Sequence, residues 1–319
     1  MAICGFQFRM YYFCSNMDSL ILLFLCMIIG VALQFAKAFP TNTHVVLNQF
    51  VIYISLPALA LYYIPKIQIN QQLLFPLGIA WIGFLLSFLL FTMLGRIFGW
   101  SKKLIGCLIL LGGLGNTSFV GFPVIEALYG KTGLQTAIIV DQPGSFMVMA
   151  TLGIIVAALY SRGKPDPKTI ILKIVSFPPF IAFFFAIVMN VLRFDFVSDM
   201  QSVFQKLGNT VTPIALVAVG LQLKFDRRSK HYGFLALGLF FKLIITPAFF
   251  YVFYRLLLKQ DNLQIDISIL ESAMAPMITA SVIATSNGLK PKLSTMMIGI
   301  GIPLSFVTLA FWYWILNAF

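Results

Sequence analysis

A run of glycine and small polar residues interrupts an otherwise apolar stretch at about residues 103–129. From Leu111 to Glu126 it reads LGGLGNTSFVGFPVIE, which is unusually rich in such residues for a helix that faces lipid. Pro123 has no amide hydrogen and clashes with the Phe119 carbonyl, so a helix is predicted to break there. The half-helix beginning near Pro123 would offer free amides and the positive end of its dipole, which suit an anion. The residues expected around that anion here are Asn116, Thr117, Ser118 and Gly121.

A second run, ESAMAPMITAS from Glu271 to Ser281, repeats this arrangement in the apolar stretch at about 266–288. Pro276 is predicted to free the Ser272 carbonyl, and Thr279 and Ser281 follow with hydroxyl groups. Unpaired backbone is tolerated in mid-bilayer only where it lines a cavity or meets another protein group. Two broken helices meeting at Pro123 and Pro276 would therefore form one site. The alternative is a pair of proline-kinked helices whose glycines allow close packing.

Three ionisable residues are candidates for an ion pair or for coupling to an ion. Asp141 and Lys242 lie well inside apolar stretches, and a charge buried in a membrane needs a partner or a task. Glu126 and Glu271 are expected near the outer ends of their helices, where a side chain can reach water, so a structural or surface role is favoured. Asp141, Lys242 and Glu271 are the coupling candidates, with H+ or Na+ left open as the coupling ion.

Composition places these runs in a membrane. Of 319 residues, 60% are hydrophobic and 10% are charged, whereas soluble domains carry about a quarter charged residues. A membrane-spanning helix needs about 20 mainly apolar residues. Ten such stretches are predicted, at about 19–39, 45–64, 73–95, 103–129, 136–160, 170–192, 203–223, 233–258, 266–288 and 292–317.

The most loop-like segment divides these ten helices into two groups of five. It runs from Ser161 to Lys168 and combines a glycine, two prolines and several charges. Because five is odd, a duplicated five-helix unit must return with inverted topology, as in many secondary transporters. The echo of LPALAL at Leu56 in TPIALV at Thr212 favours such a repeat. The predicted organisation is an N-terminal tail (1–16), a first repeat (17–160), a cytoplasmic linker (161–169) and a second, inverted repeat (170–319).

Basic residues indicate the orientation, since Lys and Arg accumulate in cytoplasmic loops. With the N-terminus outside, the loops expected in the cytoplasm hold most of the Lys and Arg, so both termini are predicted outside a multi-pass cell membrane protein. The net charge of +12 lies in short clusters between apolar runs, which does not indicate nucleic-acid binding. The partners expected are the lipid bilayer and a small organic anion.

Several classes of chemistry lack their sequence signatures. No G-x-x-x-x-G-K-[ST] motif indicates nucleotide hydrolysis. The four cysteines show no paired spacing and the two histidines stand alone, so neither a metal site nor a catalytic Cys-His or Ser-His arrangement is indicated. The chain is therefore predicted not to be an enzyme and to need no cofactor.

The motifs resemble those of the auxin efflux carrier family, which includes the plant PIN carriers and bacterial-type members. Asn116-Thr117, Gly121-Phe-Pro123 and Leu128-Tyr-Gly130 are similar to the family's run in the fourth span. Ala273-Met-Ala-Pro276, Lys290 to Thr295 and Gly220-Leu221 are similar to later family segments, so the likeness extends over the whole chain.

The resemblance implies a scaffold domain (spans one, two, six and seven) and a transport domain (three to five and eight to ten) that moves like an elevator. It also implies a carboxylate substrate, homodimers through the scaffold, and substrate contacts at Asn116 and Thr117, with Gln142 nearby. The loop between the halves is much shorter than in plant carriers. Ser176-Phe-Pro-Pro179 stands where plant carriers have Asn, which makes auxin itself a poor candidate, and Asp141 stands where they are uncharged.

The sequence thus predicts an all-α membrane protein with broken, crossing helices four and nine. Its expected function is a secondary transporter that moves a small mono- or dicarboxylate by alternating access. A membrane sensor or scaffold that binds a ligand without transport is the alternative, and a channel is a third option, favoured less because no repeated rings of residues are seen.

Overall fold

The structure is a computed structural model, and it describes residues 17–40, 42–67, 71–161, 168, 171–172, 175–222 and 232–318. The predicted N-terminal tail (1–16) and most of the predicted linker (161–169) lie outside these residues. The described chain packs as two compact units. Unit 1 takes its residues from Met1–Ile69, Ser118–Ile138 and Pro178–Leu223, and unit 2 from Asn70–Thr117, Ile139–Phe177 and Lys224–Phe319.

Within the described ranges every regular element is a helix, apart from one isolated β-bridge. An all-helical fold satisfies the backbone inside each segment, which the bilayer core demands because it offers no water. Five stretches are long and apolar enough to cross a membrane: Thr43–Lys66, Gln71–Ile97, Thr117–Tyr160, Tyr232–Leu257 and Pro291–Ala318. Two shorter apolar helices, Ile21–Leu33 and Pro178–Val191, accompany them. The protein is therefore a multi-pass membrane protein.

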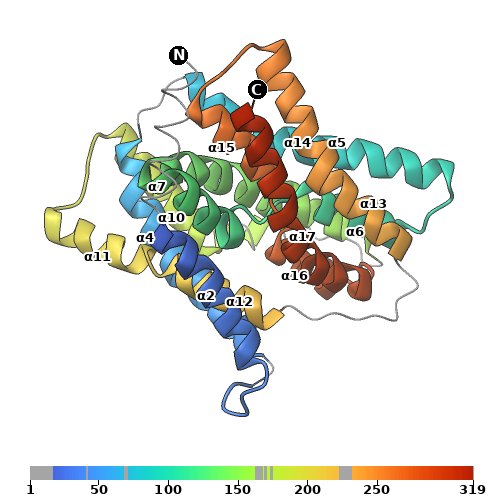
Figure 1. Cartoon of the computed structure of the whole chain (residues 1–319), viewed down its shortest axis with the longest axis horizontal. Helices are drawn as coiled ribbons and strands as arrows, with labels where there is room; N and C mark the ends of the chain where they lie inside the picture. The colour runs from blue at the N-terminus through green and yellow to red at the C-terminus, as the bar shows by residue number, and fades with distance from the viewer. Residues whose placement is uncertain are drawn as a thin grey trace. The chain divides into compact units, whose positions relative to one another are not determined.

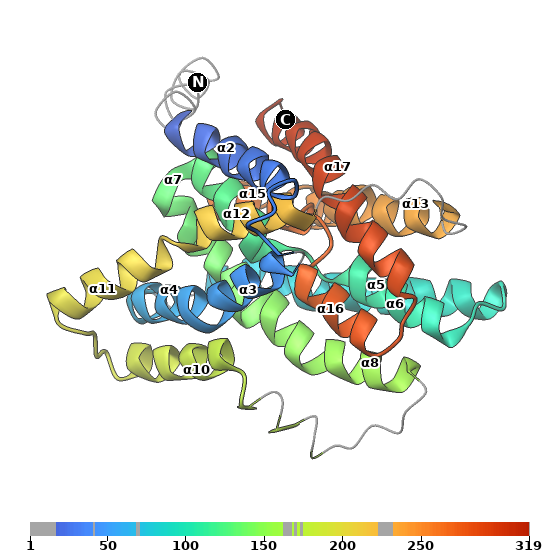
Figure 2. The same cartoon turned by 90° about the horizontal axis from the view of Figure 1, so that it is seen from below.

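Unit 1 is a cluster of helices in which the pairs α2–α12 and α4–α11 lie side by side (Figures 1 and 2). Helix α10 also packs on α4 (Figure 2). The elements of unit 1 are α2 (Met17–Leu33), α3 (Thr43–Phe50), η1 (Val51–Ser55), α4 (Leu56–Tyr63), η2 (Ile64–Lys66), nearly all of η4 (Thr117–Gly121) and α7 (Phe122–Ile139), α10 (Pro178–Val191), α11 (Ser198–Gly208) and α12 (Val211–Gln222).

Two glycines let α2 and α12 approach until their backbones touch. A Cβ atom added to Gly220 would meet the Met27 carbonyl oxygen and would lie 2.8 Å from the Gly30 Cα atom and 2.9 Å from the Val31 nitrogen. These atoms belong to backbone, which cannot move aside as a side chain does. Close packing of this kind replaces the hydrophobic effect as the force that holds helices together in lipid.

We expect Gly220→Ala to weaken unit 1 severely. The added methyl must push α2 away, and overpacking of this kind costs about 1–3 kcal/mol or more. The measurement is the midpoint unfolding temperature of the purified protein. Gly233→Ala is the matched control because a Cβ atom there meets nothing within 4 Å. Equal midpoints for the two variants would contradict the tight α2–α12 contact.

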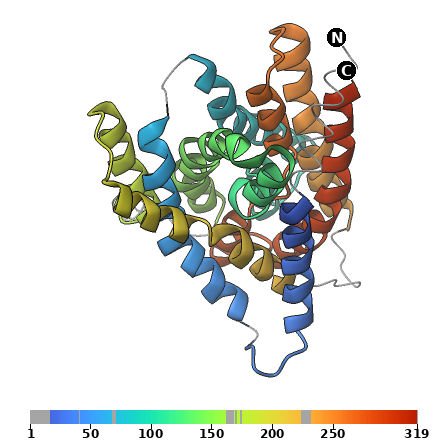
Figure 3. The same ribbon diagram turned by 60° about the vertical axis from the view of Figure 1, so that its left-hand side comes forward.

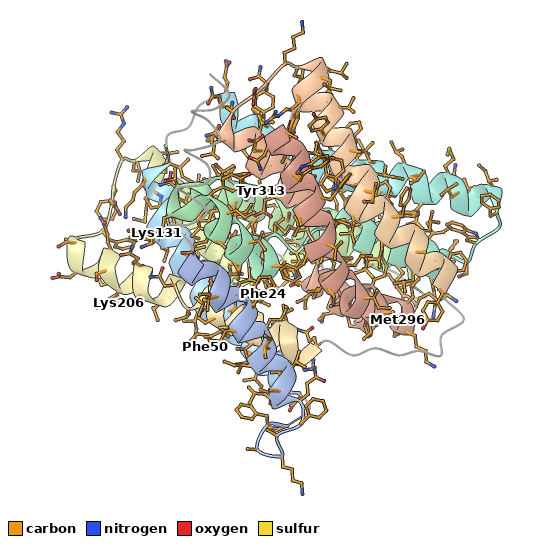
Figure 4. The ribbon with its side chains drawn as sticks, viewed as in Figure 1. Phe24, Phe50, Lys131, Lys206, Met296 and Tyr313 are labelled. Atoms are coloured by element: carbon orange, nitrogen blue, oxygen red, sulfur yellow. The ribbon has the colours of Figure 1, made fainter. Side chains whose placement is uncertain are left out.

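Unit 2 contains the remaining long helices. In it α6 packs on α5, α8 and α16, and α17 lies beside the helix that runs through α13 and η7 (Figure 3). On α17, Met296 is buried and Tyr313 is half-buried (Figure 4). The elements are η3 (Gln71–Leu73), α5 (Leu74–Ile97), α6 (Lys102–Gly113), η5 (Val140–Phe146), η6 (Met149–Gly153), α8 (Ile154–Tyr160), α13 (Tyr232–Phe240), η7 (Phe241–Ile245), α14 (Thr246–Phe250), η8 (Tyr251–Leu257), α15 (Leu263–Ser272), α16 (Ile278–Ser286) and α17 (Pro291–Ala318).

The 44-residue stretch Thr117–Tyr160 is not one straight helix. It begins with η4 (Thr117–Gly121) and continues as α7 (Phe122–Ile139), inside which Gly130 has φ +65° and ψ −165°. Glycine adopts this left-handed backbone without the steric cost that other residues carry. Gly130 therefore divides the stretch near the predicted boundary between spans four and five.

Four prolines inside helical stretches coincide with widened, π-helical turns. Pro57, Pro123 and Pro247 each stand two positions after such a turn, and Pro143 lies inside one. A proline leaves the carbonyl four residues earlier without its usual amide donor, and a π-turn changes the local hydrogen-bond pattern. Where Pro247 frees the Leu243 carbonyl, the indole of Trp312 donates to that oxygen at 3.0 Å.

Candidate functional site

Two helices of unit 2 are interrupted, and their interruptions pair with each other. The first break lies between α6 and η4, at 114–116, and the second between α15 and α16, at 273–277. An antiparallel bridge joins Gly115 to Pro276. The Asn116 amide donates to the Ala275 carbonyl at 2.7 Å, and the Met277 amide donates to the Leu114 carbonyl at 3.0 Å. Backbone amides and carbonyls that lose their helical hydrogen bonds at the breaks thus form hydrogen bonds with each other across the bridge.

The position of the first break differs from the prediction. Pro123 was expected to interrupt the helix, but it lies inside the helical stretch after the break, behind the π-helical turn η4. The widened turn accommodates the missing amide, so the helix continues through the proline. The break comes instead at Leu114, Gly115 and Asn116, which contain no proline. The prediction for Pro276 agrees with the structure, because Pro276 lies inside the second break.

The Ser272 carbonyl, which Pro276 is predicted to free, accepts a hydrogen bond from a charged side chain. The Lys242 ammonium donates to the Ser272 carbonyl at 3.1 Å, and its residue is only 3% exposed. Lys242 belongs to the π-helical turn η7. Gly115 makes room for the ammonium, because a Cβ atom there would lie 3.0 Å from the Lys242 Nζ atom. Sequence reasoning noticed Lys242 and the Ser272 carbonyl separately, but it gave Gly115 no role.

Asp141 lies at the centre of a second polar contact. Its carboxylate accepts from the Thr117 hydroxyl at 2.6 Å and from the Gln142 side-chain amide at 2.9 Å, and Asp141 is fully buried. Thr117 begins η4, directly after the first break, and Asp141 and Gln142 belong to the π-helical turn η5. Among the described residues, the Gln142 side-chain oxygen has no hydrogen-bond partner. The structure therefore brings three of the predicted residues, Thr117, Asp141 and Gln142, into contact.

Glu271 corrects another expectation. It was placed near the outer end of its helix with access to water, but its exposed fraction is 0%. It stands in the last turn of α15, directly before the break, so it lies where the span is interrupted rather than at the membrane surface. No hydrogen-bond donor in the described part of the chain reaches either of its carboxylate oxygens. Glu126, the other such residue, is half-buried in unit 1 and accepts from the Thr212 hydroxyl at 3.2 Å.

A small cavity joins several of these groups. Its volume is about 10 Å³, and it is lined by polar and charged residues and a few apolar ones, among them Gly115, Thr117, Ser145, Lys242, Thr246 and Glu271. A single water needs a space of about that size. The cavity is therefore far too small to hold an organic anion in this structure.

The other predicted site residues lie on α16, in η4 and in the first break. Ser281 is buried on α16, and its hydroxyl lies 2.8 Å from that of Ser294 on α17, so it links two helices. Thr279 is half-buried on α16. Ser118 and Gly121 are buried in η4 and belong to unit 1. Asn116 lies in the first break and is fully buried, and its amide makes one bond of the bridge.

Similarity to known proteins extends over nearly the full length of the chain. The family profile described as "Membrane transport protein" matches residues 15–313. An uncharacterised transporter of Methanocaldococcus jannaschii is 29% identical over 312 residues, covering 94% of this chain and 98% of the relative. An uncharacterised transporter of Methanothermobacter thermautotrophicus is 25% identical over 306 residues, with the same coverage of both chains. With its interrupted helices and this full-length match, the chain belongs to the membrane transport protein family, whose members are auxin efflux carrier-like.

Proposed function

We propose that this transporter is a secondary carrier that moves a small organic anion, a mono- or dicarboxylate, across the cell membrane by alternating access. The observation that carries the proposal is the antiparallel bridge between two interrupted helices. Inverted-repeat carriers bind their substrates where such broken helices meet near the middle of the membrane. Family membership and the transporter-named relatives support the coarser function.

The bridge also supports the proposed architecture of ten helices in two inverted repeats. Helix α6 with η4 and α7 would be the fourth span, and α15 with α16 the ninth. Corresponding segments of two inverted repeats run in opposite directions, and the bridge joins the two breaks in antiparallel fashion. We propose that unit 2, together with η4 and α7 of the fourth span, forms the moving domain, and that the rest of unit 1 is the scaffold, through which two copies associate.

The proposed anion site uses the second half-helix of each pair. Both η4 and α16 begin directly after a break, so each directs the positive end of its dipole towards the bridge region. Asn116 and the second hydrogen of the Gln142 amide supply neutral donors beside the first of these ends, where Thr117 already donates to Asp141, and Thr279 lies in the first turn of the second. Neutral donors and helix ends bind a carboxylate without a full countercharge, which suits a substrate that must also be released.

Counterflow in proteoliposomes tests this function. Thermal-shift screening of mono- and dicarboxylates on purified protein selects the probe, beginning with malonate. Vesicles loaded with the unlabelled compound should then accumulate the labelled compound transiently, whereas protein-free vesicles should not. Binding without counterflow would replace the proposal with a ligand sensor. Unitary currents in planar bilayers would replace it with a channel.

We also propose that Asp141 couples transport to a proton or contributes to a cation site. Its two oxygens each accept a hydrogen bond, so protonation would break one of these contacts and change the groups beside Asn116. Asp141→Asn is expected to transport at a rate that no longer varies with pH. The measurement is the initial uptake rate at a series of pH values, with Asp195→Asn as a control outside the site. Unchanged dependence on pH and on cations would remove this role.

A further inference from the structure

We infer that the Lys242 ammonium is a built-in cation that occupies the position of a coupling metal ion at the end of α15, so that the carrier works without Na⁺ or K⁺ and, of the two roles proposed for Asp141, only coupling to a proton remains. This inference deepens the proposed function and rests on it for its transport measurement.

The carbonyl end of a half-helix is where carriers of this architecture hold their cations. The last carbonyls of a helix lack amide partners and carry the negative end of the dipole, and in broken-helix transporters they coordinate Na⁺. In this protein, the carbonyl at the end of α15 is that of Ser272, freed by Pro276. Its oxygen accepts from the Lys242 ammonium at 3.1 Å, so a positive charge already stands at this end of the helix.

Glu271 supplies the anionic group that such a cation site requires. Hard cations prefer carboxylate and carbonyl oxygens, and Glu271 and Ser272 are neighbours that offer one of each. Glu271 is 0% exposed, and within the described residues neither of its oxygens has a hydrogen-bond donor. Lys242 lines the same cavity. A carboxylate buried in this way needs a positive charge nearby, and the Lys242 ammonium in the same cavity is placed to supply it.

The space beside Lys242 is too small to hold both the lysine side chain and a cation. The cavity that Lys242 shares with Glu271 has a volume of about 10 Å³, room for about one water. Gly115 allows the ammonium to reach this point, since any Cβ atom there would crowd the Lys242 side chain. Shortening Lys242 would open a polar space bounded by the Glu271 carboxylate and the Ser272 carbonyl, two groups whose oxygens can ligate a monovalent cation.

Thermal unfolding in different salts tests the inference without a substrate. We expect the wild-type midpoint to be the same in NaCl, KCl and choline chloride at equal ionic strength. Lys242→Ala should unfold at a lower temperature in choline chloride, and Na⁺ or K⁺ should raise its midpoint by about 2 °C or more. Adding Glu271→Gln to Lys242→Ala should abolish that response. Lys242→Ser, which opens the same space but keeps a polar group in it, replaces Lys242→Ala if the alanine variant does not fold.

Two results would overturn the inference. One is a wild-type protein that Na⁺ or K⁺ stabilises over choline. The other is a folded Lys242→Ala or Lys242→Ser variant with equal midpoints in all three salts. Malonate counterflow adds a separate measurement: the wild type should exchange equally well in choline and in Na⁺ buffer, and a requirement for Na⁺ would also overturn the inference. Absence of counterflow in every buffer counts against the proposed function alone, because the thermal experiment still decides the role of Lys242.

Discussion

Replacing Pro276 with alanine is expected to reduce transport to the level of protein-free vesicles while the protein remains folded. Alanine at 276 brings an amide hydrogen that can donate to the Ser272 carbonyl, four residues earlier. That bond would extend α15 into the break, displace the Lys242 ammonium from its acceptor and disturb the bridge to Gly115. Counterflow measures the loss, and the unfolding midpoint and the elution volume on gel filtration measure the folding.

Pro247→Ala is the matched control for this experiment. Pro247 also lies in a helix of unit 2 and also frees a carbonyl that a side chain captures, that of Leu243 by Trp312. It takes no part in the bridge. We therefore expect Pro247→Ala to keep most of its transport. Full activity in Pro276→Ala, or equal losses in both variants, would show that the bridge is not the functional centre.

Asp266→Asn is expected to destabilise the protein by about 3 kcal/mol, the low end of the cost of removing one partner from a buried ion pair, because Asp261 still lies beside the same guanidinium. The Arg255 guanidinium, at the end of η8, contacts the Asp266 carboxylate, on the first turn of α15. Their side chains are 8% and 3% exposed. This pair links α15 to η8 near the loop that connects them. The measurement is the unfolding midpoint of the purified protein.

Asp261 offers a control with the same chemistry and different burial. Its carboxylate lies 3.1 Å from the same guanidinium, but its side chain is 76% exposed. Exposed ion pairs contribute about 0–1 kcal/mol, so Asp261→Asn should barely change the midpoint. If the two variants unfold at the same temperature, burial does not determine the strength of this contact.

Much of the fold could be predicted from the sequence because membrane helices have a simple signature. Long apolar stretches with few charges indicate membrane-spanning helices without any tertiary information. The glycine-rich run in one of them indicates a helix that is interrupted or closely packed. The freed carbonyl of Ser272 was also predictable, since it follows from the covalent structure of Pro276 alone. What proline cannot reveal is which group will capture that carbonyl, and the donor proved to be Lys242, about 30 residues earlier in the chain.

The error at Pro123 has a physical origin. A proline in a helix can be accommodated by a break or by a widened turn, and sequence alone does not choose between them. Around Pro123 the helix widens, whereas the break falls at Gly115, where an approaching strand of backbone from the other helix pairs with it. The pairing partner lies more than 150 residues away in the chain, so no local pattern contains this information.

The error at Glu271 follows from the same feature. The predicted span begins at residue 266, so Glu271 is predicted in its first turns, close to the membrane surface. That prediction would be correct only if the span were uninterrupted. In the structure α15 is a short helix that ends at Ser272, so its last turn reaches the interruption. A residue in the last turn of this half-helix is therefore buried inside the protein, where an ionised side chain needs an opposite charge or hydrogen-bond donors.

The widened turns beside Pro57, Pro123 and Pro247 also affect how relatives should be compared. A π-turn holds one more residue than an α-helical turn, and each residue rotates the following side chains by about 100° around the axis. A relative without the proline can lose that residue and keep every later side chain on its original face. Single-residue gaps in alignments of this family are therefore expected inside transmembrane helices, at these turns, and not only in loops.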